Sequence, residues 1–194
     1  MNNRDYKNFS SGQIYHIYNR GNNKEKIFFD EQDYRAFLFR LGLCLGFTEE
    51  ELNREKLLAM PYSRIRISDV KTGDYFLHSF CLMPNHFHLL IEQTSDKPVS
   101  KLIAKLCTSY SKYVNKKYSR VGHVFQDKFK AVLIENNEQL MWIFEYIHTN
   151  PVKDSIVKKL SDYTWCSYND FLNNRNLLIT NKKFKDLLDV KDGL

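Results

Sequence analysis

Two histidines separated by one residue, His86 and His88, are the strongest sign of chemistry in this sequence. They follow the apolar run Tyr75–Cys81 and begin a stretch that alternates like a β-strand. Successive side chains of a strand point to opposite faces, so the two imidazoles share one face. The other face is apolar and carries Phe87, Leu89 and Ile91. Two imidazoles on an anchored strand predict a two-point ligand for a divalent cation. The alternative, two incidental histidines, stays open for this pair alone.

A tyrosine and an asparagine lie four residues apart on a predicted helix near residue 150. Asn136 can cap this helix, with Gln139 three residues later. Tyr146 lies about a third of a turn off the apolar stripe, so its hydroxyl can reach the edge of the core, and Asn150 shares that flank. Pro151 disfavours helix at the residue before it, which predicts a helix break at Asn150. The predicted core stripe is Leu140, Ile143, Phe144 and Ile147.

Strands and helices alternate along the rest of the chain. We expect strands at Gln13–Asn19, Arg64–Ser68, Tyr75–Cys81, from His86 to Glu92, and loosely at Val124–Glu135. We expect helices at Asp30–Phe47, within Thr48–Met60, and from Val99 or Ser100 to about Tyr118. This order predicts an α+β domain with an antiparallel sheet and helices on one face. His16, on the first strand, could approach the histidine pair, although a structural role is the simpler expectation.

Positive charge is concentrated between Lys97 and Lys130. This segment holds nine basic residues against one acid, Asp127, a local excess of +8, whereas the whole chain carries +6. Tyr110, Tyr113, Tyr118 and Phe125 lie among them. Lysines and aromatic rings together suit a nucleic-acid backbone with bases stacked on the rings, and a solvated helix face is the alternative. The lysines predicted to contact DNA are Lys101, Lys105, Lys112, Lys128 and Lys130.

The 194 residues are enough for one domain, and 43% of them are hydrophobic. We expect a flexible lead-in at 1–12, one domain at 13–170 with an insertion at 48–72, and a tail at 171–194. No apolar run approaches the ~20 residues of a membrane span, and the first residues lack the apolar core of a signal peptide. We therefore expect a cytoplasmic protein without membrane contact. The four cysteines are far apart, as expected for free thiols.

Three motifs together resemble the single-tyrosine HUH transposases, and most closely their REP-associated branch. HUH stands for histidine, hydrophobe, histidine. The motifs are Tyr15–Asn23 (YHIYNRGNN), Cys81–Leu90 (CLMPNHFHLL) and Tyr146–Lys153 (YIHTNPVK). The resemblance extends from about Ile14 to Tyr168. The insertion at 48–72 is longer than the family's usual passage, and Lys128 stands where arginine is expected.

The resemblance implies a ferredoxin-like or RRM-like sheet and a nuclease that rejoins DNA. By this resemblance His86 and His88 are metal ligands for Mg²⁺ or Mn²⁺, and Tyr146 is the nucleophile that forms a 5′-phosphotyrosine. Asn150 completes or orients the metal site, and Arg20 contacts DNA. The implied partner is single-stranded or hairpin DNA. A homodimer is also open, with each site formed within one chain or by exchange of helices.

Two other classes of function fit parts of the pattern. One is a catalytically inactive protein that binds single-stranded nucleic acid on an RRM-like sheet. The other is a metal-dependent phosphoesterase that uses water as the nucleophile. A phosphoesterase needs more carboxylates near the histidines, where Glu92 alone is close in sequence.

Overall fold

A computed structural model describes residues 9–55, 57, 70–172, 175 and 177–189. Its centre is a four-stranded sheet with the order β2-β3-β1-β4 and antiparallel pairing throughout. The strands are β1 (Gln13–Arg20), β2 (Tyr75–Met83), β3 (His86–Gln93) and β4 (Lys130–Leu133). With a helix between β1 and β2 and another between β3 and β4, this is the ferredoxin-like arrangement that the sequence predicts. The predicted α+β class is confirmed.

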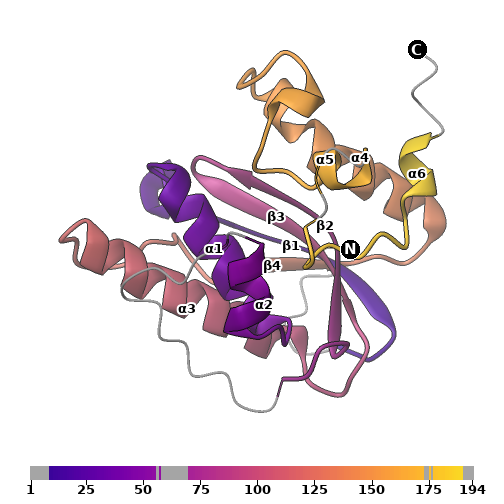
Figure 1. The fold of residues 1–194 in the computed structure, drawn as a ribbon, viewed down its shortest axis with the longest axis horizontal. Coiled ribbons are helices and arrows are strands. Elements are labelled where there is room, and N and C mark those ends of the chain that lie inside the picture. Colours follow the sequence, from indigo (N-terminus) through magenta and orange to yellow (C-terminus); the bar gives the residue numbers. More distant parts are fainter. Residues whose placement is uncertain (1–8, 56, 58–69, 173–174, 176, 190–194) are drawn as a thin grey trace.

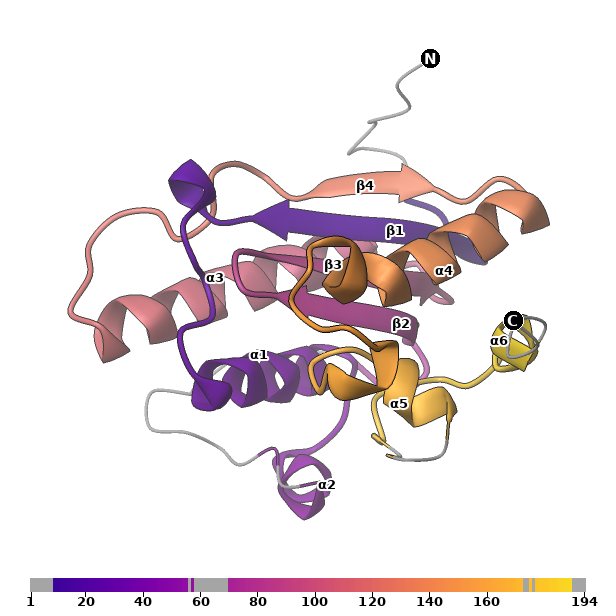
Figure 2. The same cartoon turned by 90° about the horizontal axis from the view of Figure 1, so that it is seen from above.

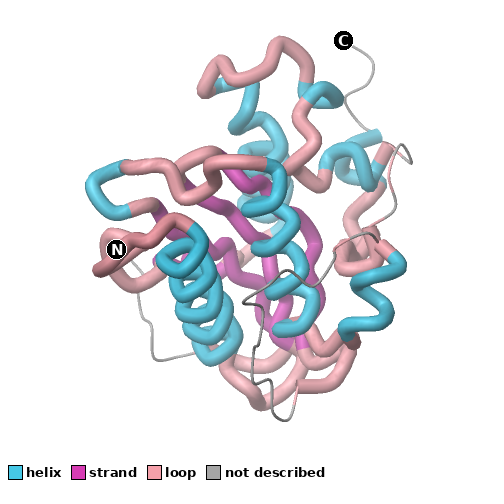
Figure 3. Tube along the Cα trace, turned by 60° about the vertical axis from the view of Figure 1, so that its left-hand side comes forward, coloured by secondary structure: helices cyan, strands magenta, loops and turns pink. Residues whose placement is uncertain are grey.

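Helices α1 (Glu31–Cys44) and α3 (Val99–Lys117) cover one face of the sheet. Asp30 begins α1 by accepting a hydrogen bond from the Asp33 amide, and the Asp33 side chain bonds back to the Asp30 amide. The two helices pack side by side against the sheet (Figure 3). Their apolar residues and those of the inner face of the sheet form one core. Phe87, Leu89 and Ile91 lie in this core, fully buried, as predicted for their face of β3.

Helix α4 (Asn137–Lys153) lies on the other face of the sheet, mainly over β2 (Figure 1). The sequence analysis expected helices on one face only, so the position of α4 differs from that expectation. Asn136 caps α4 by accepting from the Gln139 amide, as predicted. The predicted stripe is buried and packs with Leu90 of β3, each such side chain contributing roughly 1.5–3 kcal/mol. The stripe is Leu140, Ile143, Phe144 and Ile147.

The last strand is shorter than the predicted Val124–Glu135. Val124 and Phe125 are buried, but they pair with the turn after β1 through a bridge between Gly21 and Phe125, and not with the sheet. The chain crosses the end of β1 before strand pairing starts at Lys130. Regular strand therefore forms only at Lys130–Leu133.

Part of the insertion forms α2 (Glu49–Arg54), which Thr48 and Glu51 cap reciprocally. Figure 2 shows α2 on the side of α1 that faces away from the sheet. Leu52 of α2 is fully buried against Gly42 of α1, where a Cβ atom would clash with the leucine. The predicted strand Arg64–Ser68 lies outside the described residues.

The described C-terminal residues pack against β2. Thr180 forms a bridge with Leu77, and the Asn181 amide donates to the Leu77 carbonyl. Short helices η2 (Leu160–Asp162), α5 (Tyr168–Phe171) and α6 (Asp186–Asp189) complete this part. A further 3-10 turn, η1 (Asn22–Lys24), follows β1. The predicted domain limits at 12 and 170 remain predictions.

Candidate active site

The strand register brings the predicted histidines beside polar residues of β1. His88 pairs with Tyr18 across the β1–β3 ladder, and His86 pairs with Arg20. Tyr18 in turn pairs with Lys130 of β4. Paired residues of an antiparallel sheet share a face, so these side chains form a polar row on the face that α4 partly covers.

His86 and His88 lie with their ring centroids 5.0 Å apart, on the same face as predicted. Each uses its Nδ1 atom for a local hydrogen bond. His86 Nδ1 donates to Asn85 Oδ1 at 2.6 Å, and His88 Nδ1 lies 2.9 Å from Nε2 of His16. In both rings Nε2 is then the nitrogen available to a metal, provided that His88 is the donor in its bond to His16.

Burial keeps these imidazoles neutral. Desolvation, with the nearby charge of Arg20, lowers the pKa of His86 to about 4. Burial likewise lowers the pKa of His16 to about 4, and it lowers the pKa of His88 well below the usual value. Since a metal binds the neutral ring, all three histidines are in a ligand-competent state at neutral pH.

Helix α4 places Tyr146 over the histidines. The Tyr146 ring lies edge-on to His88, with centroids 5.4 Å apart, and edge-on to His16 at 6.1 Å. Burial raises the pKa of Tyr146, while the side chain of Asn150 and the charge of Arg20 act in the opposite direction. The phenol is therefore protonated at neutral pH and loses its proton only when it reacts.

Asn150 is buried one turn after Tyr146, and its Nδ2 donates to the Tyr146 carbonyl at 2.6 Å. The predicted helix break at Asn150 is wrong, because α4 continues through Pro151 to Lys153. Pro151 lies in the last turn, where the missing N–H costs one hydrogen bond, and the Asp154 amide still reaches the Asn150 carbonyl. Asn150 is thus held by a continuous helix.

A cavity of about 330 Å³ lies beside this cluster. Its wall includes His86, His88 and Tyr146. Four cationic side chains, Arg20, Lys24, Lys128 and Lys130, line it with one carboxylate, Asp127. The structure therefore brings three of the predicted DNA contacts to the predicted catalytic residues.

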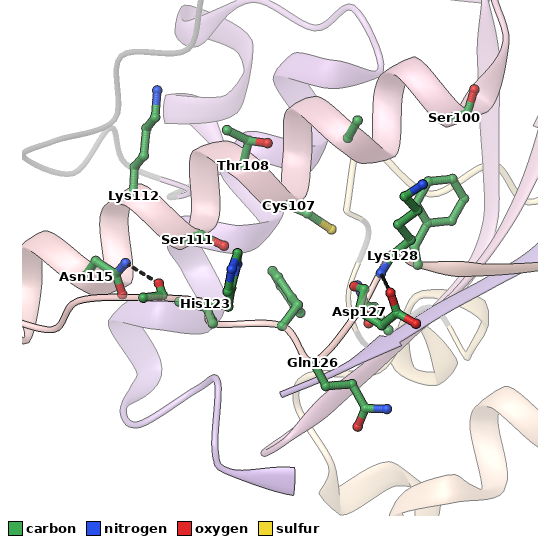
Figure 4. Close-up of a pocket in the computed structure, with 16 residues that line it drawn as sticks. Ser100, Cys107, Thr108, Ser111, Lys112, Asn115, His123, Gln126, Asp127 and Lys128 are labelled. Atoms are coloured by element: carbon green, nitrogen blue, oxygen red, sulfur yellow. Dashed lines mark hydrogen bonds between the residues drawn. The ribbon is translucent and has the colours of Figure 1, made fainter. Parts of the chain in front are cut away.

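The other predicted contacts lie elsewhere. Lys101, Lys105 and Lys112 project from α3, on the opposite face of the sheet. Lys112 lines a separate groove of about 830 Å³ between α3 and residues 122–129 (Figure 4). Asn19, Gln126, Asp127 and Lys128 line both this groove and the cavity, so the two hollows meet at the end of β1.

The aromatic residues of the basic segment do not form a stacking surface, contrary to the sequence-based prediction. Tyr110 and Tyr113 are fully buried, and their hydroxyls donate to the Ile27 carbonyl and to Asp33. Phe125 is buried, and the Tyr118 hydroxyl bonds to Asp33. These rings serve the core between α1 and α3. Tyr110 and Tyr113 belong to the apolar stripe of α3.

Two neighbours of the site were missed or undervalued. His16 contacts His88 directly. Strand alternation predicted the face on which His16 lies, but we expected a structural role for it. Trp142 stacks on Tyr146 with centroids 5.3 Å apart, and the signal for it was its position one turn before the tyrosine. The exposure of Trp142 could not be predicted from the sequence, because it depends on how α4 packs on the sheet.

The donor set fits a Mg²⁺- or Mn²⁺-type ion that shares its ligands with a substrate. Among the described residues there is no cluster of three His, Cys, Asp or Glu side chains that could hold a metal. Two neutral imidazoles would provide part of a coordination shell. Asn150 lies one turn from Tyr146 and is not among the residues that line the cavity. Water and phosphate oxygens would supply the rest.

Comparisons with known proteins show which proteins this chain resembles. A family model described as IS200-like transposase matches residues 55–150, which include both histidines, Tyr146 and Asn150. Over these residues the chain is similar to the IS200-like transposases. A Haemophilus influenzae protein named as a REP-associated tyrosine transposase is 27% identical over 100 residues, covering 46% of this chain and 57% of that protein.

A solved structure of a REP-associated tyrosine transposase bound to a REP hairpin has the same fold. The TM-score is 0.61 at 14% sequence identity, over 87% of this chain and 85% of the other. The chain therefore shares the fold of that structure, and its own α+β sheet is the one that the sequence predicted. No helix in its described part is long and apolar enough to cross a membrane.

Proposed function

We propose that this chain is a metal-dependent transposase that cleaves and rejoins single-stranded DNA through Tyr146. The observation that carries the proposal is the position of Tyr146, whose ring lies 5.4 Å from that of His88 in a cavity shared with His86. A potential nucleophile and a neutral histidine pair thus meet where a phosphate would bind. Arg20, Lys128 and Lys130 in the same wall supply the positive charge that a DNA backbone needs.

The proposed substrate is single-stranded DNA beside a hairpin. The solved relative is bound to a REP hairpin, which supports a hairpin-forming partner here. The active-site cavity is small and lies against the sheet. A strand within a duplex is held by its partner strand and cannot enter such a cavity alone. An unpaired strand can follow the cavity and turn its phosphate towards Tyr146.

In the proposed reaction the Tyr146 oxygen attacks the phosphorus of one phosphodiester. The phenolic oxygen forms the new bond to phosphorus as the bond to the 3′ oxygen breaks, and the 3′ oxygen takes up a proton. The phenol proton passes to solvent. The products are a 5′-phosphotyrosine and a free 3′-OH, and attack by a 3′-OH reverses the step and restores the phenol.

The residues around Tyr146 make this attack easier. Burial raises the pKa of the phenol, and the charge of Arg20, which lines the wall beside it, offsets part of that effect. The Lys153 ammonium lies 5.3 Å from the centre of the Tyr146 ring, where it favours developing negative charge on the oxygen. The hydrogen bond from Asn150 to the Tyr146 carbonyl ties the two side chains to one turn of α4.

His86 and His88 would hold the divalent ion through Nε2, with the oxygen of Asn150 as a further donor. When bound, Mg²⁺ or Mn²⁺ would neutralise the scissile phosphate and stabilise the leaving oxygen. Asn85 and His16 keep the two rings in the orientation that presents these nitrogens.

The proposal is tested with labelled single-stranded and hairpin oligonucleotides in Mg²⁺, Mn²⁺ or excess EDTA. We expect cleavage with either ion and none in EDTA, and we expect His86→Ala or His88→Ala to reduce cleavage to background. Both variants should fold normally, because Phe87, Leu89 and Ile91 anchor the strand on the opposite face. His123→Ala is the matched control, since His123 is exposed and lies outside the cavity.

Undiminished cleavage in EDTA would contradict the metal requirement. Binding of the oligonucleotides without cleavage under any ion would favour the alternative of a catalytically inactive nucleic-acid-binding protein.

A further inference from the structure

Trp142 is an exposed aromatic residue directly beside the proposed nucleophile. It lies one helical turn before Tyr146 on α4, and 61% of its surface is open to solvent. Its indole is stacked on the Tyr146 ring, with centroids 5.3 Å apart and an angle of 10° between the planes. A large apolar side chain in such a position serves neither the core of α4 nor the core between α1 and α3.

The stack leaves one face of the indole available. One face contacts Tyr146, so the large exposed fraction requires the other face to be open. Tyr146 is itself fixed by its edge contacts with His16 and His88. Trp142 is therefore a preorganised flat surface, which binds a planar ligand at a low cost in side-chain entropy.

The charges around this surface favour nucleic acid over protein. Lys153 lies over the same Tyr146 ring, and Arg20, Lys128 and Lys130 line the cavity beside it. A strand whose phosphate lies at Tyr146 would bring a neighbouring base close to the indole. Met141 is also exposed, at 52%, but two apolar residues among these cations make a poor protein interface.

We propose that Trp142 is a stacking platform for an unpaired nucleobase next to the phosphate that Tyr146 attacks. This inference rests on the proposed function and adds a binding subsite to it. The ligand class is a single-stranded nucleotide, because both faces of a base within a duplex are already covered by its neighbours. Stacking on an aromatic ring accepts every base, so the subsite fixes the position of the strand and not its sequence.

The chain offers a direct optical test, since Trp142 and Trp165 are its only tryptophans. Trp165 is stacked on Tyr34 at 4.6 Å, and Trp165→Phe keeps an aromatic ring there. In a Trp165→Phe/Tyr146→Phe protein, which cannot form the adduct, all tryptophan fluorescence comes from Trp142. We expect a single-stranded oligonucleotide to quench it and a blunt duplex of equal length to leave it nearly unchanged.

Abasic scanning then locates the base. A series of oligonucleotides, each lacking one base, is titrated by anisotropy against three proteins that all carry Tyr146→Phe. The first keeps Trp142, the second adds Trp142→Phe and the third adds Trp142→Ala.

We expect one abasic position to weaken binding to the first protein by about tenfold, from the ~1–3 kcal/mol of one stacked base. With Trp142→Ala that penalty should disappear, and with Trp142→Phe most of it should remain. Met141→Ala is the matched control and should keep the full penalty.

An abasic penalty that is equal in the tryptophan and Trp142→Ala proteins at every position would overturn the inference. So would a change in oligomeric state on Trp142→Ala, measured by sedimentation, with no change in the abasic profile, because the indole would then contact another protein. These readouts need only DNA binding, so they are separate from the test of the proposed function. If the abasic penalty does not depend on Trp142 but the unmodified protein cleaves DNA, only the proposed subsite is wrong. If the penalty depends on Trp142 but the unmodified protein does not cleave, only the transposase proposal is wrong.

Discussion

At the scale of residues, the contact between His16 and His88 is the feature that most changes the view of the site. The sequence placed His16 on one face of its strand, but the face alone could not show which residue of β3 lies opposite. That depends on the β1–β3 register, which long-range packing sets. With the register known, His16 becomes the hydrogen-bond partner of His88, the proposed metal ligand.

We predict that His16→Phe weakens Mn²⁺ binding by about 10–100-fold, the usual effect of losing a partner of a ligating histidine. The ring of phenylalanine fills the space, so the change in fold should be small, whereas the hydrogen bond to His88 Nδ1 is lost. Calorimetric Mn²⁺ titration of the protein with a short oligonucleotide measures the effect, and nitrogen NMR of His88 reports its tautomer. If Mn²⁺ affinity and the His88 tautomer are both unchanged, His16 is only a packing residue.

At the scale of elements, helix α4 shows both the strength and the limit of sequence analysis. Its cap and its apolar stripe were predicted, because local spacing determines them. The helix break at Asn150 was wrong, because a proline near a helix end can be accommodated when later amides find acceptors. Helical spacing nevertheless placed Tyr146 and Asn150 on one flank, as observed.

We predict that Asn150→Ala lowers cleavage and raises the metal concentration needed for half-maximal activity, with DNA affinity nearly intact. Alanine removes the amide oxygen and also the bond to the Tyr146 carbonyl. Asn150→Asp is the matched variant, since it keeps an oxygen donor and should retain more activity than alanine. The dependence of cleavage on Mg²⁺ concentration measures both. An equal Mg²⁺ dependence in all three proteins would remove Asn150 from the metal site.

The basic segment divides into two groups of lysines that the sequence could not separate. Lys128 and Lys130 line the cavity, whereas Lys101 and Lys105 lie on α3 at the opposite face. We predict that Lys128→Gln/Lys130→Gln lowers the salt dependence of single-strand binding by about 0.7 per lysine. Lys101→Gln/Lys105→Gln, with the same loss of charge, should have a smaller effect on a short oligonucleotide. If both double variants change the salt dependence equally in anisotropy titrations, the lysines contribute only general electrostatic attraction and do not define the path of the DNA strand.

At the scale of the whole molecule, the sheet and its two cores agree with the expected order of elements. Periodicity indicates the main strands and helices, although not all of their limits, but the side of the sheet that α4 covers depends on the chain path after β4. The pairing of residues 124–125 with the turn after β1 is equally non-local and could not be predicted from alternation. The same non-local packing buries several histidines, which has a consequence for stability.

We predict that the free energy of unfolding falls as the pH is lowered from 7 to 5. Burial lowers the pKa of His16 and of His86 to about 4 and that of His148 to about 3, whereas the unfolded values lie near 6.5. In this window the unfolded chain binds more protons, so each such group removes up to about 1.4 kcal/mol of stability per pH unit below about 6.5. Urea denaturation at several pH values measures the change. A stability that is constant from pH 7 to 5 would contradict the buried, neutral state of these rings.

The central claim is that the Tyr146 oxygen attacks DNA, and the protein–DNA adduct tests it most directly. An oligonucleotide labelled on the 3′ side of the cut is incubated with the protein and Mg²⁺, then run on a denaturing gel with and without protease. We predict a labelled species of reduced mobility that protease removes. Tyr146→Phe, which lacks one oxygen and keeps the ring packed between Trp142 and the histidines, should bind the DNA normally and give neither cleavage nor adduct. Cleavage by the unmodified protein without any adduct, or an adduct that persists in Tyr146→Phe, would contradict the account.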